Sequence, residues 1–78
     1  MSAHHLRSPE GRAEYFGRFL AAQHDATGSR RDAPLSGEWA DETTPRDVCT
    51  YALGRFPTDD DADTLAELCD AFEEGYFG

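Results

Sequence analysis

The chain of 78 residues contains no lysine, no asparagine and no isoleucine, and all seven of its basic side chains are arginine. The codons of the three missing amino acids are rich in A and T, so their joint absence indicates a GC-rich genome. An actinobacterium, one of its phages or a haloarchaeon would fit this composition. In a haloarchaeon the excess of acidic residues would be an adaptation of the whole surface to high salt.

Positive charge is scarce: seven arginines stand against 16 acidic residues, and the formal net charge is −9. Direct binding to nucleic acid or to an anionic membrane is disfavoured, because affinity for phosphate requires clustered Lys and Arg. The sequence has neither a long apolar run that predicts a membrane-spanning helix nor the N-terminal pattern of a signal peptide. Cys49 and Cys69 fall among apolar residues, which predicts two reduced core thiols in a cytoplasmic protein.

Motifs that carry chemistry are absent as well. No pair of cysteines or histidines has the spacing of a structural zinc site. Asp59, Asp61 and Asp63 match the first half of a calcium-binding loop, but Thr64 and Asp70 stand where that loop needs glycine and glutamate. No nucleophile elbow, phosphate loop or dinucleotide fingerprint occurs, and so short a chain has little core in which to form a deep pocket. We therefore expect no catalytic residue, metal, cofactor or enzymatic activity.

What the sequence does contain is an amphipathic helical pattern with clear start and stop signals. Ser8 and Pro9 predict the start of one helix and Gly28 its end. Thr44, which is followed by proline, predicts the start of the next helix, and Gly54 predicts its end. The expected fold is all-α: a single domain over residues 8–78, built as a small three-helix bundle or orthogonal array. The helices are expected over about 9–27, 45–53 and 59–74, after a frayed N-terminus at 1–7 and with a long irregular loop at 29–43.

The third predicted helix has the most regular pattern. Its apolar residues recur at the spacing of one helix face, and they are Leu65, Leu68, Cys69, Phe72 and Tyr76. Eight acidic residues lie between Asp59 and Glu74. Most of these carboxylates must face solvent when the apolar stripe turns inward.

The charge is distributed unevenly along the chain. Residues 1–37 carry +1, from five arginines and four acids, whereas residues 38–78 carry −10, from two arginines and twelve acids. Uniform adaptation to salt would acidify the first helix as well. The acidic third helix therefore predicts docking on a basic protein in the manner of a nucleic-acid mimic, with a solvated acidic face as the alternative. The predicted contact residues are Trp39, Asp60, Asp61, Asp63, Glu67, Asp70, Glu73 and Glu74.

The aromatic residues support a second hypothesis. Trp39 is the only tryptophan and lies in the long loop; interface hot spots favour this residue type, although it would serve equally to close the core from outside. So small a core is also one that a second chain often completes. The alternative function is thus a homodimeric or hetero-oligomeric interaction module that uses exposed aromatics, with Tyr15, Trp39, Tyr76 and Phe77 as candidates.

Two stretches carry a resemblance. Residues 34–41, PLSGEWAD, and residues 71–77, AFEEGYF, resemble small uncharacterised proteins of high-GC phages and their actinobacterial hosts. Such small acidic proteins include anti-restriction and anti-CRISPR inhibitors, some of which resemble DNA electrostatically. The resemblance covers about a fifth of the chain and implies this class of inhibitor, without assigning a role to any single residue.

Overall fold

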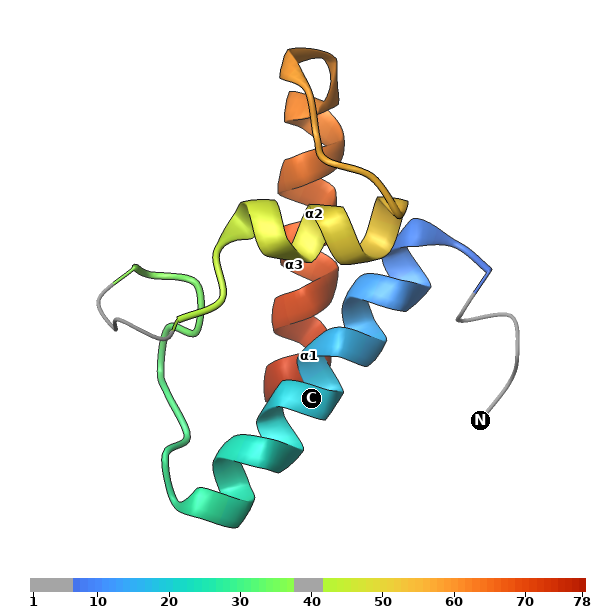
Figure 1. The fold of residues 1–78 in the computed structure, drawn as a ribbon. Helices are drawn as coiled ribbons and strands as arrows, with labels where there is room; N and C mark the ends of the chain where they lie inside the picture. Colours follow the sequence, from blue (N-terminus) through green and yellow to red (C-terminus); the bar gives the residue numbers. More distant parts are fainter. Residues whose placement is uncertain (1–6, 38–41) are drawn as a thin grey trace.

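The computed structural model describes residues 7–37 and 42–78, so Trp39 and most of the predicted frayed N-terminus lie outside the described residues. Within the described ranges the chain is helical and has no strand, which confirms the all-α prediction. The elements are α1 (Pro9–Thr27), α2 (Pro45–Leu53), the short 3-10 helix η2 (Asp59–Asp61) and α3 (Ala62–Phe77). α1 crosses α3 obliquely, and α2 lies across the end at which α1 begins (Figure 1).

Local capping determines where α1 and α2 begin and end. The Ser8 hydroxyl accepts a hydrogen bond from a backbone amide in the first turn of α1, and Gly28 ends this helix in the left-handed conformation, at φ 68°. Thr44 and Asp47 cap α2 reciprocally, since each side chain accepts a hydrogen bond from the other residue's backbone amide. These contacts satisfy amides that an isolated helix end leaves without partners.

The third helix differs from its predicted bounds of 59–74. Its first residues form the tighter turn η2, because Asp61 reaches back to the backbone amide and hydroxyl of Thr58. α3 then continues to Phe77, three residues beyond the predicted end. Gly75 does not fray this end, since it is buried against α1.

The core lies where the three helices meet. Its fully or nearly buried hydrophobic residues are Ala13, Ala21, Val48, Cys49, Ala52, Leu68, Phe72 and Tyr76. The ring of Phe16 on α1 packs edge-on against Phe72 of α3 at a centroid distance of 5.4 Å, and it packs at a tilt of 46° against Tyr51 of α2 at 5.0 Å. Phe16 therefore connects all three helices through aromatic contacts.

Two glycines set the distance between α1 and α3. A Cβ at Gly17 would overlap the carbonyl oxygen of Phe72, and a Cβ at Gly75 would overlap the carbonyl oxygen of Glu14. Each helix thus places its backbone directly against the backbone of the other. This close crossing fixes which side chains of the two helices lie next to each other at the surface.

Candidate functional site

The outer face of α3 carries a row of carboxylates, which we call the ridge: Asp63, Glu67, Asp70 and Glu74. All four side chains are exposed, and their spacing of four, three and four residues aligns them along one side of the helix. They face outward because Leu68 and Phe72 of the same helix are buried in the core. Asp60, which is also exposed, precedes the ridge in η2.

Two glutamates of α1 lie beside the ridge. Glu10 and Glu14 line a surface groove of about 510 Å³ together with acidic residues of α3. The groove, which we call the acidic groove, is lined by Ser8, Glu10, Gly11, Glu14, Glu67, Asp70, Ala71 and Glu74. Glu10 and Glu14 were not among the predicted contact residues, and Glu10 was expected only to favour the start of the first helix. Their separation of four residues was the available signal, but only the crossing of α1 and α3 shows which surface they share.

A second hollow continues the acidic surface toward the end of α3. It measures about 410 Å³ and is lined by Asp70, Glu73, Glu74 and Phe77. Asp70 and Glu74 belong to both hollows. The Phe77 side chain is 52% exposed, so a large apolar group stands at the edge of the acidic surface.

The carboxylates of the ridge are not neutralised by the described part of the chain. Across residues 7–37 and 42–78, no arginine forms an ion pair with a ridge carboxylate; the pairs that do form are Arg18–Glu14, Arg30–Asp25 and Arg55–Asp61. In the acidic groove, Glu14 is the one carboxylate with such a partner, at 2.6 Å from Arg18. The groove therefore presents a concentrated negative charge to solvent.

Asp61 was predicted to face a partner, and this placement is wrong. Its side chain is buried and accepts hydrogen bonds from Arg55 at 2.8 and 3.0 Å and from the Thr58 amide at 2.8 Å. These bonds, those from Arg55 first, hold the pKa of Asp61 well below its usual range. Asp61 acts as an internal cap that connects the 54–58 turn to α3, and it is neutralised by the chain itself.

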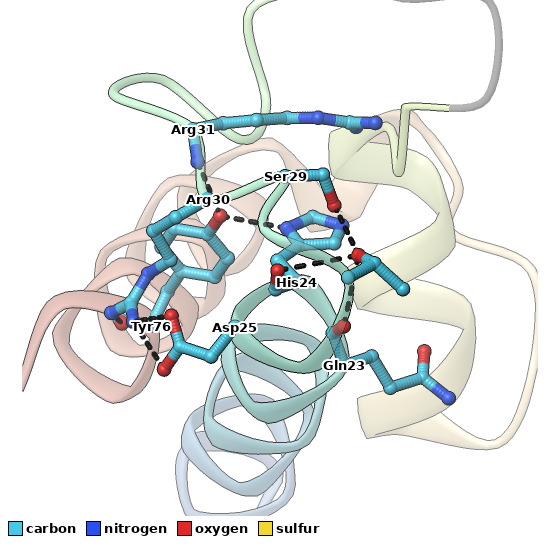
Figure 2. A network of polar contacts seen from close by, with 8 residues as sticks. Gln23, His24, Asp25, Ser29, Arg30, Arg31 and Tyr76 are labelled. Atoms are coloured by element: carbon cyan, nitrogen blue, oxygen red, sulfur yellow. Dashed lines mark hydrogen bonds and ion pairs between the residues drawn. The ribbon is translucent and has the colours of Figure 1, made fainter.

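Tyr76 was a candidate for an exposed dimer contact, and this prediction is also wrong, since its side chain is fully buried. Its hydroxyl accepts a hydrogen bond from the Arg31 backbone amide at 2.8 Å and lies 2.7 Å from Nδ1 of the buried His24 (Figure 2). The Arg30 guanidinium stacks over the Tyr76 ring at 4.6 Å and pairs with Asp25 (Figure 2).

The contacts among Tyr76, His24 and the Arg30–Arg31 segment form one polar network. This network connects the end of α1, the loop after it and the end of α3, and it holds these three segments together. Arg30 also donates a hydrogen bond to the Tyr76 carbonyl oxygen. The guanidinium is therefore engaged on the ring, the backbone and the carboxylate of Asp25 at the same time. Tyr76 is consequently a core residue with a polar end.

The two cysteines are free thiols. Cys49 is fully buried between the helices, and burial raises its pKa. Cys69 is partly buried, and burial followed by the neighbouring Cys49, Glu73 and Asp70 raises its pKa to about 11. Both groups are therefore poor nucleophiles near neutral pH, because the reactive species is the thiolate.

Among the described residues, no helix is both long and apolar enough to cross a membrane. Comparison of the chain with protein-family models, curated proteins and solved structures finds no match. The function proposed next therefore rests on the side chains of this chain alone.

Proposed function

We propose that this chain is a small binding protein that docks the acidic groove and the ridge on a basic surface of a nucleic-acid-handling protein and thereby inhibits or modulates it. The observation that carries this proposal is the group of exposed carboxylates, those of the ridge on α3 and Glu10 on α1, that lack an arginine partner within the described residues. A surface of this kind attracts clustered Arg and Lys over long range and accelerates association with them.

The arrangement supports mimicry of nucleic acid more than a single acidic helix would. The ridge extends over roughly 17 Å, since its ends are eleven residues apart at about 1.5 Å per residue. Glu10 and Glu14 of α1 form a second, shorter row that lines the same groove, and Arg18 pairs with Glu14 of this row. Two acidic rows that flank a groove resemble the two phosphate strands beside a groove of a duplex, although DNA carries about one charge per 1.7 Å of axis and is denser.

The ridge lowers the stability of the free protein. Like charges three or four residues apart on a helix cost roughly 0.2–0.5 kcal/mol per pair, and Asp63–Glu67, Glu67–Asp70 and Asp70–Glu74 are such pairs. Arginines of a partner would relieve this repulsion on binding. The residues from Arg18 to Ala26 on α1, in contrast, carry balanced charge, which is the opposite of what uniform salt adaptation produces.

The proposal is tested with two variants of equal net charge. Glu67→Gln with Glu74→Gln removes two carboxylates from the acidic groove, and Asp32→Asn with Asp59→Asn removes two exposed carboxylates away from it. Wild-type and variant proteins are immobilised and exposed to host lysate at low and at high salt. Proteins that the wild type captures only at low salt are then purified, and their binding to duplex DNA is measured with and without the chain.

We expect the groove variant to lose capture and DNA displacement, and the control variant to retain both. Equal capture by the two variants would show that total charge, and not this surface, governs binding. Captured proteins that do not bind nucleic acid, or whose DNA binding the chain leaves unchanged, would contradict the mimicry itself.

A further inference from the structure

The face of α1 that contacts neither α2 nor α3 carries an apolar stripe of its own. The stripe consists of Tyr15, Phe19, Ala22 and Ala26, spaced by four, three and four residues. Phe19 is 51% exposed, both alanines are exposed, and Tyr15 is half-buried. This spacing is the a/d pattern with which one helix packs against another in a coiled coil. The stripe is not part of the core, because α1 contacts α3 at Gly17 and contacts both α2 and α3 through Phe16.

The charges beside the stripe are balanced, unlike those of α3. Between Arg18 and Ala26 the chain carries one positive and one negative side chain, Arg18 and Asp25, and both are exposed. In the heptad that the stripe defines, these two residues occupy equivalent g positions, one heptad apart and at the same edge of the stripe. A protein of net charge −9 thus has one apolar helix face without an excess of negative charge.

We propose that a second copy of this chain covers this face, with the two α1 helices packed antiparallel around a two-fold axis between Phe19 and Ala22. In this register Phe19 lies opposite Ala22 of the second copy, and Tyr15 lies opposite Ala26 of the second copy. Each large ring then meets a small side chain, and the symmetry repeats both contacts. A two-fold axis makes such an interface self-complementary, since one patch serves both copies.

The charges favour the same arrangement. Within one chain Arg18 pairs with Glu14 and Asp25 pairs with Arg30, and all these side chains except Glu14 are exposed. In an antiparallel pair the two edges that carry Arg18 and Asp25 run beside each other, so Arg18 of one copy also approaches Asp25 of the other, twice per dimer. A parallel pair would instead place Phe19 on Phe19 and Ala22 on Ala22, which leaves the alanine layer poorly filled. The acidic groove lies on the α3 side of α1, so both grooves of the dimer stay open and the inference does not depend on the proposed function.

Self-association through this stripe is weak and depends on concentration. The stripe is about 17 Å long and one helix wide, which is less than the roughly 800 Å² per partner that standard stable interfaces bury. We therefore expect a monomer–dimer equilibrium with a dissociation constant on the order of 100 μM.

Sedimentation equilibrium over a range of concentrations tests this interface with a matched pair of variants. Phe19→Ser and Phe77→Ser each remove an exposed phenylalanine, of 51% and 52% exposure respectively. Wild type and Phe77→Ser should both shift toward the dimer mass as concentration rises, whereas Phe19→Ser should remain monomeric with unchanged circular dichroism. A wild type that stays monomeric to about 1 mM, or a Phe19→Ser protein that dimerises like the wild type, would overturn the proposal.

A mixing experiment tests the antiparallel register. Arg18→Asp alone places acid against acid across the dimer, and Asp25→Arg alone places base against base, so each variant should dimerise at least tenfold more weakly than the wild type. When the two are mixed, the charges introduced at positions 18 and 25 become complementary, and a heterodimer should form with near wild-type affinity. Absence of the heterodimer, while both variants remain helical, would refute this register.

Discussion

Replacing Gly17 or Gly75 by alanine tests the crossing on which the acidic groove depends. At an open position inside a helix this exchange stabilises by roughly 0.5–1 kcal/mol, because glycine loses more backbone entropy on folding. Here the added methyl group would overlap a carbonyl oxygen of the facing helix. That oxygen belongs to a backbone held by its own helix, so no side-chain rotation relieves the overlap and the two helices must move apart.

Forcing extra volume into a packed interface costs about 1–3 kcal/mol, and the rigid backbone contact favours the upper end of this range. After subtraction of the gain in helix propensity, we expect the free energy of unfolding of each variant to be about 2 kcal/mol lower than that of the wild type. In a domain of this size the same change lowers Tm by roughly 8–16 °C. Because one separation of α1 and α3 relieves both overlaps, the double variant should cost less than the sum of the single ones.

Urea unfolding followed by circular dichroism gives these values from the transition midpoint, provided that the slope is unchanged. Ala66→Gly, at an exposed position of α3, is the control and should lose about 1 kcal/mol from propensity alone. If Gly17→Ala or Gly75→Ala instead stabilises the protein by the amount that an open helix site predicts, the helices do not cross at these glycines. The shared surface of Glu10, Glu14 and the ridge would then lose its structural basis.

Three further outcomes follow from buried or partly buried groups. The pKa of Asp61 is lowered in the folded state, so the stabilisation that its carboxylate provides is present above the ordinary aspartate pKa of 3.8 and is lost as the pH falls below that value. Asp61→Asn should therefore reduce the fall of Tm at acidic pH, and an unchanged fall would contradict this. The pKa of Cys69 is raised from 9.0 to about 11, so the stabilisation that its neutral thiol provides is complete below pH 9 and is lost as the pH rises toward 11. Cys69→Ala should therefore weaken the decline of Tm at alkaline pH. Rapid labelling of the wild-type thiol at pH 7 without denaturant would contradict its burial and raised pKa. Tyr76→Phe removes the hydroxyl that bonds the loop amide and the buried histidine and should lower the free energy of unfolding by about 1–3 kcal/mol, whereas a loss near zero in urea unfolding would show that the network does not hold the loop.

The ends of α1 and α2 were predictable from local sequence because capping acts within one turn. Ser8, Gly28, Thr44 and Asp47 each contact backbone groups no more than four residues away. The outward orientation of Glu67 and its neighbours on the ridge also follows from local information, namely the period of the apolar residues between them. These features need no knowledge of where another helix lies.

The site itself depends on contacts between residues far apart in the chain. The burial of Tyr76 requires the loop after α1 to fold over it, 45 residues away in the chain. The inward turn of Asp61, in contrast, depends on Arg55 and Thr58, which are only six and three residues away. Glu14 and Glu74 line the same groove because two glycines let the backbones of α1 and α3 come into contact. Helical periodicity determines which side of its own helix a residue occupies, but only tertiary packing decides which helix lies beside that side.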